Sequence, residues 1–304
     1  AGSTFFVAVC LLGVASATAI DLGDGWYNTF KPSTHALPST SSEAESSGWH
    51  KHDGCDPALG VWHTHNGQAP SKTKPLSLFF NAAGQPSGMR VDIWGTSWTS
   101  SIGPAAQPNL VSKGFWRVEG DPSDDHWYIV LTTREAGASM CDGSLAPNSL
   151  GDCLLVNPDA RLNFSMPLTA ADAAKQGYAP GSCMETMGQH WFLDLELRNG
   201  KQGWIEGDLL PIVPMYTPAD GTGKIHAVFF TTPVVQDGSY LLGEAGWESP
   251  FLPDSLMCQN WCDSACTWKT MGWSTMHVYF DSSYKTFKCP GGSGIVGRSC
   301  PNDA

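Results

Sequence analysis

The sequence predicts a mainly β protein, one domain arranged as a two-sheet sandwich or jelly roll with few short helices. Short stretches alternate apolar and polar residues and are separated by Gly, Pro and Asn, which is the pattern of strands joined by turns. Helical periodicity is scarce. With 304 residues, 41% hydrophobic and 15% charged, the chain can bury a sizeable core. The sequence shows no repeat at a fixed period.

Individual elements follow from the same patterns. Thr169–Gln176 has the best helical propensity, with Thr169 or Ala170 opening the helix and Gly177 closing it. The alternation predicts strands over Leu76–Asn81, Met89–Gly95, Gly114–Glu119, Trp127–Thr133, His190–Arg198, Lys224–Thr232 and Thr275–Asp281.

The N-terminal part has the features of a secreted protein. Residues 1–19 are expected to be a signal peptide, because an apolar run over 5–14 precedes the small residues Ala17-Thr18-Ala19. Residues 20–48 contain a Ser-rich, weakly hydrophobic segment that predicts a flexible leader. The folded extracellular domain is expected over 49–304. Asn163 begins an Asn-Phe-Ser triplet, an N-glycosylation acceptor that fits a secreted glycoprotein.

The charge of the chain argues against two classes of partner, and its hydropathy argues against a membrane span. The chain has 17 Lys and Arg against 29 Asp and Glu, and a formal net charge of -12. This balance argues against binding to nucleic acid or to anionic membrane surfaces. After the signal segment, no stretch is long and apolar enough to span a bilayer.

Cysteine usage predicts disulfides, which are the default in secreted chains. One of the ten cysteines lies in the signal segment, so an odd number remains. Cys141 and Cys153 flank a loop rich in Gly, Pro and Asn and are the expected local pair. A disulfide-stapled C-terminal subregion is expected from Cys258, Cys262, Cys266, Cys289 and Cys300.

The stretch Met187–Arg198 carries the main candidate for a functional site. In a strand, successive side chains point to opposite faces. One face then holds Trp191, Leu193, Leu195 and Leu197, and the other holds His190, Phe192, Asp194, Glu196 and Arg198. The second face combines an imidazole, two carboxylates and a guanidinium.

Two other predicted strands repeat this division into an aliphatic face and a polar-aromatic face. The polar-aromatic residues are Arg90, Asp92 and Trp94 on one strand, and Trp273, Thr275, His277, Tyr279 and Asp281 on another. Exposed Trp and Tyr rings on a sheet are typical of a surface that stacks on a flat ligand, so we expect Trp94 and Trp273 to contact sugar rings.

Asp194 and Glu196 are candidates for glycoside hydrolysis, which needs one protonated and one ionised carboxyl group across the scissile bond. They lie two positions apart on one strand face, where a neighbouring carboxylate raises one of the two pKa values. Leu193–Leu197 resembles the jelly-roll glycosidases whose catalytic strand carries alternating acids. That resemblance implies an acid/base pair at Asp194 and Glu196. The family has a further acid where this chain has Phe192.

A polysaccharide lyase would use other residues. Proton abstraction next to a uronate carboxylate needs a His or Tyr base and a cation that neutralises the acid. His190, His277, Tyr279 and Arg90 supply these groups. A non-catalytic glycan-binding or cell-wall protein would keep the aromatic face and tolerate loss of the carboxylates. A polysaccharide or other glycan is the expected partner in all three cases.

A metal site is the alternative prediction. His63 and His65 occupy alternating positions, so their imidazoles share one strand face and are spaced to bind zinc or copper. A third imidazole from His190 or His277 would leave one position open for water. In that case Asp194 and Glu196 would orient the imidazoles as hydrogen-bond partners.

Overall fold

The fold is described from a computed structural model of the chain. It describes residues 26–30, 33–71, 74–94, 116–117, 126–134, 139–142, 153–156, 164–193, 196–198, 201–203, 212–217, 223–232, 274–280 and 282–289. Within these ranges, no helix has the length and apolar character needed to cross a membrane.

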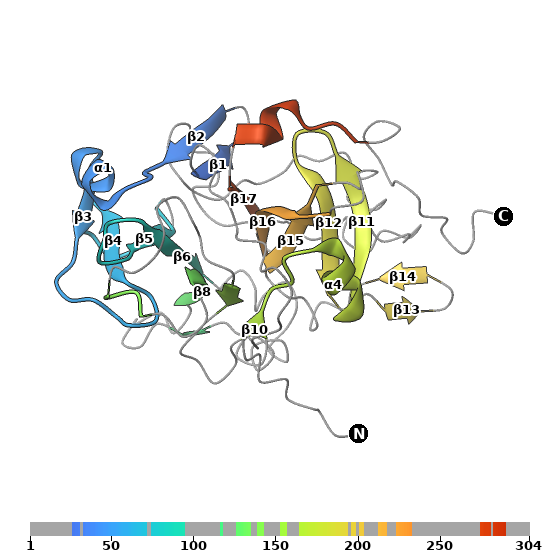
Figure 1. Cartoon of the computed structure of the whole chain (residues 1–304), viewed down its shortest axis with the longest axis horizontal. Coiled ribbons are helices and arrows are strands. Elements are labelled where there is room, and N and C mark those ends of the chain that lie inside the picture. Colours follow the sequence, from blue (N-terminus) through green and yellow to red (C-terminus); the bar gives the residue numbers. More distant parts are fainter. Residues whose placement is uncertain are drawn as a thin grey trace, which may run out of the picture.

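Two antiparallel sheets make up most of the fold (Figure 1). The eight-stranded first sheet has the order β10 (Phe164–Ser165), β9 (Cys153–Val156), β8 (His126–Arg134), β6 (Pro86–Trp94), β5 (Leu76–Phe80), β4 (Val61–His65) and β3 (Trp49–Lys51), with β7 (Trp116–Arg117) also paired to β8. The seven-stranded second sheet has the order β11 (Tyr178–Met184), β12 (Gly188–Leu193), β15 (Ile212–Tyr216), β16 (Ile225–Thr232), β17 (Ser274–Tyr279), β1 (Trp26–Phe30) and β2 (Ser33–Leu37).

The other described elements are short. β13 (Glu196–Arg198) and β14 (Lys201–Gly203) form a separate two-stranded sheet, and the helices are α1 (Ser41–Ser46), α4 (Ala170–Lys175) and the 3-10 helix η4 (Ser282–Thr286). The prediction of a mainly β, two-sheet protein with few short helices is therefore confirmed.

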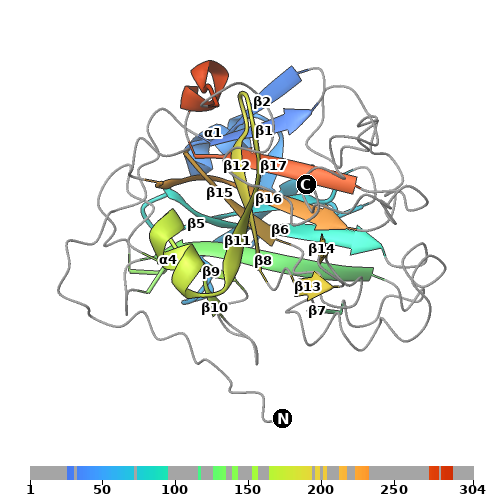
Figure 2. The ribbon, with the colours of Figure 1, turned by 90° about the vertical axis from the view of Figure 1, so that its right-hand side faces the viewer.

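A single hydrophobic cluster joins the inner faces of the two sheets. Figure 2, seen from the side of the second sheet, shows the strands of that sheet in front of those of the first. Alternate residues of each strand enter the cluster, as strand geometry requires. The central members are Leu76, Phe80, Met89, Val91, Ile129 and Leu131 from the first sheet, and Ile212, Tyr216, Val228, Phe230, Met276 and Val278 from the second.

The two sheets have the same strand order, which indicates that the chain contains two repeats of one unit. Read outward from one edge, β3-β4-β5-β6-β8-β9-β10 corresponds to β11-β12-β15-β16-β17-β1-β2. A short helix precedes the edge strand in both, α1 before β3 and α4 before β11. Each repeat also has a register shift at the same place, between Phe79 and Phe80 and between Met215 and Tyr216. The second sheet has a further shift between Pro180 and Cys183.

Around the two helices, each residue of the first repeat is separated from its equivalent in the second repeat by the same number of positions in the sequence. The N-caps Thr40 and Thr169 each accept a hydrogen bond from the backbone N–H three residues on, which stabilises the first turn. Gly48 and Gly177 follow the helices with φ of 91° and 89°, a conformation that favours glycine. The same spacing relates the buried pairs Leu37 and Met166, Ala44 and Ala173, and Trp49 and Tyr178.

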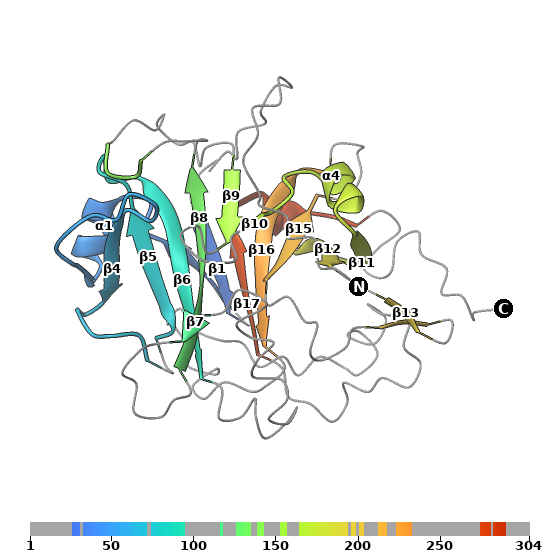
Figure 3. The ribbon, with the colours of Figure 1, turned by 90° about the horizontal axis from the view of Figure 1, so that it is seen from below.

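Each repeat donates its first hairpin to the sheet of the other. β1 and β2 begin the first repeat but pair with β17, which is the last strand of the second. β9 and β10 begin the second repeat but pair with β8 of the first, and Figure 3 shows β9 alongside β8. This exchange covers one edge of each repeat and links the two units into one body.

The disulfides follow the same symmetry. Cys55, which lies between β3 and β4, bonds to Cys141 after β8, and Cys183 on β11 bonds to Cys289 after β17. The predicted pairing of Cys141 with Cys153 is wrong, because Cys141 is bonded to Cys55. Cys153 instead lies on β9, where its backbone pairs with Arg134 of β8.

Two expected segments have a different structure. Part of the segment expected as a flexible leader forms β1, β2 and α1, and it places Leu37 and Ala44 in the core. The strand predicted over His190–Arg198 ends at Leu193, and Glu196 begins a strand of the separate hairpin. The signal segment, residues 1–19, lies outside the described residues.

Candidate functional site

The face of the first sheet that points away from the core carries a band of polar and aromatic side chains. On β6 the residues between the core positions are Arg90, Asp92 and Trp94, as the sequence predicts. On β8 they include His126 and Tyr128, next to the core residues Trp127 and Ile129. We define the polar band as His52, Trp62, Arg90, Asp92, Trp94, His126 and Tyr128.

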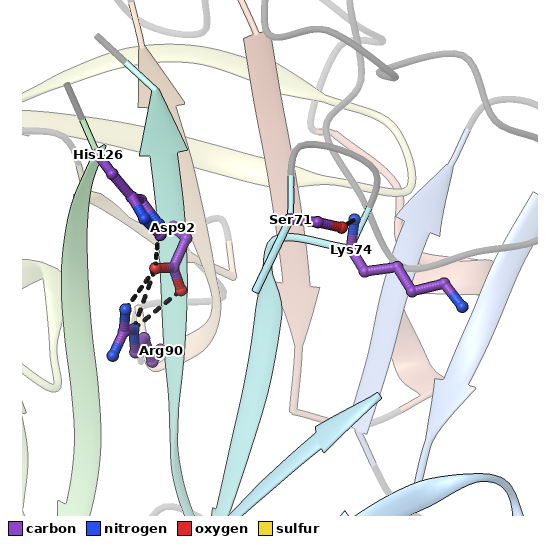
Figure 4. Close-up of polar contacts among 5 residues, drawn as sticks. All are labelled: Ser71, Lys74, Arg90, Asp92 and His126. Atoms are coloured by element: carbon purple, nitrogen blue, oxygen red, sulfur yellow. Dashed lines mark hydrogen bonds and ion pairs between the residues drawn. The ribbon is translucent and has the colours of Figure 1, made fainter. Parts of the chain in front are cut away.

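Asp92 is the centre of the polar band. Its carboxylate accepts hydrogen bonds from Nε of Arg90 at 2.9 Å to Oδ2 and from Nη2 of Arg90 at 2.6 Å to Oδ1. Nε2 of His126 lies 2.7 Å from Oδ1 (Figure 4). The side chain of Asp92 has 0% exposure, that of His126 7% and that of Arg90 16%.

The strand register explains how these three groups meet. Asp92 is paired with Tyr128, and its neighbour Trp94 with His126, so His126 lies diagonal to Asp92 on the same face. Arg90 is two residues before Asp92 on β6 and therefore shares its face. A buried carboxylate needs partners for its charge, and Arg90 and His126 supply them.

Aromatic rings flank this centre on both sides. The guanidinium carbon of Arg90 lies 3.8 Å from the ring centroid of Tyr128 and 5.6 Å from that of Trp62, both within cation–π range. Trp94 stacks on His126 with centroids 4.5 Å apart and planes 16° apart. The stack extends to the sheet edge, where His52 lies 4.5 Å from Trp62 at 22°.

The geometry restricts what the polar band can do. Asp92 fixes the position of the Arg90 guanidinium, which in turn holds a set orientation over Tyr128. His126 is oriented by the carboxylate, as in sites where an acid positions an imidazole for proton transfer. The polar band therefore offers a fixed cation, an oriented imidazole and flat apolar rings within one sheet face.

The equivalent face of the second sheet holds three of the other predicted residues. The rings of His190 and His277 lie 6.0 Å apart in an edge-to-face arrangement, and His277 stacks on Tyr279 at 6.3 Å. Phe229 fills the position equivalent to Arg90 and contacts both imidazoles, at 5.3 Å and 4.7 Å. Arg90 lies on the first sheet, so the four predicted lyase residues fall into two groups.

His63 and His65 share one face of β4, as the sequence predicts, but that face turns toward the core. His63 is fully buried, with Nε2 2.9 Å from Oγ of Ser41 and Nδ1 3.2 Å from the Val61 carbonyl oxygen. Burial lowers the pKa of His63, which favours the neutral imidazole.

His65 packs on Trp49, with centroids 4.3 Å apart. Among the described residues, no group of three or more His, Cys, Asp and Glu is arranged to hold a metal ion. His190 and His277 belong to the other sheet and contact each other there, so the described contacts do not join them to His63 and His65.

Several predicted site residues lie where the structure gives no side-chain description. Asp194, Trp273 and Asn163 lie outside the described residues. Glu196 lies on β13, and only its backbone pairing with Gly203 is described.

His126, Trp62 and Tyr128 are functional candidates that sequence reasoning did not select. The strand predicted over Trp127–Thr133 begins one residue after His126 and so leaves this imidazole outside it. Alternation along 126–133 would have placed His126 and Tyr128 on one face. No sequence signal indicates that this face adjoins Arg90 and Asp92, because the chain between β6 and β8 is long.

Comparison of the chain with models of protein families, with curated proteins and with solved structures finds no match.

Proposed function

We propose that this protein is a secreted carbohydrate-active enzyme whose glycan binds along the polar band. The observation that carries the proposal is the Arg90 guanidinium, held by the buried Asp92 and stacked on Tyr128 at 3.8 Å. Aromatic faces pack on the apolar faces of sugar rings, and a fixed guanidinium donates hydrogen bonds to sugar oxygens. Trp62 and Trp94 extend the stacking surface to either side.

The residues of the polar band support proton abstraction more than two-carboxylate hydrolysis. Asp92 is the one carboxylate of the polar band, and it is engaged by Arg90 and His126. Hydrolysis by the general glycosidase mechanism needs a second carboxyl group across the bond. His126, oriented by Asp92, and the neighbouring Tyr128 are the groups suited to move a proton. We therefore favour a lyase, and the hydrolase alternative uses Asp194 and Glu196.

Secretion is supported by the two disulfides, since such bonds form and persist in oxidising compartments. The sequence adds the expected signal peptide and the glycosylation triplet at Asn163.

The test is turnover on a panel of neutral and acidic polysaccharides, measured as new reducing ends and as ultraviolet absorbance of unsaturated product. A lyase produces both signals and a hydrolase only the first. Replacing His126 with Gln should reduce turnover at least about 100-fold, the usual contribution of a general base. Glu196→Gln is the matched variant for the hydrolase, and it should leave lyase turnover unchanged. Turnover that survives His126→Gln but not Glu196→Gln would reverse the assignment.

A non-catalytic glycan-binding protein is the second candidate, and the burial of the centre favours it. His126 is 7% exposed and Asp92 is fully buried, which suits a rigid support for Arg90 and Trp94. Such a protein would bind polysaccharide without forming product, and His126→Gln would leave its affinity within about threefold of wild type.

A further inference from the structure

We infer that the glycan is acidic and that Trp62, Ser77 and Arg90 form the site for its carboxylate or sulfate group. The inference rests on the proposed function and adds the chemical class of the ligand and three binding atoms. The residues lie on β4, β5 and β6, which are neighbouring strands of the first sheet.

Trp62 and Ser77 each bury a polar atom that has no hydrogen-bond partner among the described residues. These atoms, Nε1 of Trp62 and Oγ of Ser77, are both inaccessible to solvent. Buried polar groups are nearly always paired, since an unpaired one costs about 1–3 kcal/mol. A ligand that accepts from both atoms would remove this cost.

Arg90 is a neighbour of both residues. Ser77 is directly opposite Arg90 in the β5–β6 register, and both residues point away from the core. The guanidinium carbon of Arg90 is 5.6 Å from the centroid of the Trp62 ring. The hydrogen bonds to Asp92 use Nε and Nη2, while Nη1 of Arg90 donates to no described residue.

The chemistry of these three groups selects an acceptor-rich ligand. The indole N–H and the guanidinium can only donate, and the Ser77 hydroxyl can donate as well. Carboxylate and sulfate groups present several acceptor oxygens and no donor, and hydrogen bonds from a cation to such groups are the strong ones. A neutral sugar hydroxyl would match fewer of the donors.

The local charge agrees with an anionic ligand although the chain has a net charge of -12. Arg90 offsets the Asp92 charge, and Nε2 of His126 is a second hydrogen-bonding partner of the same carboxylate. Ser77 also lines a small pocket with Ser71 and Lys74; the lining of that pocket contains no acid, and it does not include Trp62 or Arg90. Figure 4 shows Ser71 and Lys74 at the turn before β5, on the other side of that strand from Asp92.

Binding measurements with conservative variants test the inference. The probes are alginate, the same polymer after carboxyl reduction, dextran sulfate and dextran. Trp62→Phe keeps an aromatic ring and removes the indole N–H together with part of the ring system, whereas Ser77→Ala removes only the hydroxyl. Because the Ser77 hydroxyl has no partner among the described residues, Ser77→Ala should unfold at the wild-type denaturant midpoint or above it. Trp62→Phe should unfold somewhat earlier, because the smaller ring loses packing. Each should bind the acidic polymer roughly tenfold more weakly.

Trp127→Phe is the matched control. Its indole Nε1 is also buried and unpartnered, but Trp127 belongs to the core face of the same sheet. This variant should bind the acidic polymer as wild type does. A preference for alginate indicates a carboxylate ligand, and a preference for dextran sulfate indicates a sulfate.

The inference is overturned if wild type binds alginate and carboxyl-reduced alginate equally, or if Trp62→Phe and Ser77→Ala leave acidic affinity unchanged. In those cases glycan binding remains and only the anion site is wrong. Failure to bind any of the probes, acidic or neutral, would instead contradict the proposed function.

Discussion

Nε2 of His126 lies 2.7 Å from Oδ1 of Asp92, although 34 residues separate them in the chain. Asp92 is fully buried, so this contact and the two hydrogen bonds from Arg90 satisfy a charge that water does not reach. Removing a buried charge from such a network leaves its partners uncompensated. The stability of the first sheet and the shape of the polar band therefore depend on the same carboxylate.

Asp92→Asn should destabilise the protein by about 3–5 kcal/mol, because Arg90 loses the charge that offsets its burial and His126 loses its carboxylate partner. Urea denaturation gives the free energy of unfolding directly. Lys175→Gln is the control, since Lys175 pairs with Asp172 at 75% and 50% exposure and such pairs contribute about 0–1 kcal/mol. Equal effects of the two variants would show that Asp92 is not a structural centre.

The two disulfides should differ in their resistance to reduction. Cys55 is exposed and Cys141 is half-buried, whereas Cys183 and Cys289 are 0% and 6% exposed. Reduction requires attack of a thiolate on an accessible sulfur, so Cys55–Cys141 should open first. Timed alkylation followed by peptide mass mapping measures this. A linked Cys141–Cys153 peptide in the native protein would contradict the structure.

His63 should make the stability of the protein fall at mildly acidic pH. Burial lowers the pKa of His63 from 6.5 in the native state, so the unfolded chain binds more protons below pH 6.5. The free energy of unfolding should fall as the pH drops through this value, and this contribution should level off below the lowered native pKa.

His63→Gln removes this titration, so the free energy of unfolding should have a smaller pH slope between pH 7 and 5 than in wild type. The other histidines contribute to both proteins and cancel in the comparison. An unchanged slope would mean that His63 is not held neutral by burial.

The N-terminal hairpin should be required for a stable second sheet. β1 pairs with β17 through Tyr27 and Tyr279, Asn28 and Val278, and Thr29 and His277. Deleting residues 1–37 would expose the β17 edge and remove Leu37 from the core. We expect a lower thermal midpoint and self-association, measured by calorimetry and light scattering. Deletion of residues 1–25 retains both strands and is the control.

The sequence by itself determined the local features. Alternation placed Arg90, Asp92 and Trp94 on one face, and the structure agrees because side-chain direction along a strand is a property of the backbone. The helix expected from Thr169 forms over Ala170–Lys175 for a similar reason, since the Thr169 side chain caps it locally.

Only the tertiary structure decided which distant segments meet. The pairing of β6 with β8 brings His126 to Asp92, and the partner of Cys141 is Cys55 rather than the nearer Cys153. The repeat cannot be recognised in the sequence, because residues at equivalent positions in the two sheets are of different types, as with Arg90 and Phe229. Strand order depends on how two sheets bury a common core, and that is a property of the whole chain rather than of any segment.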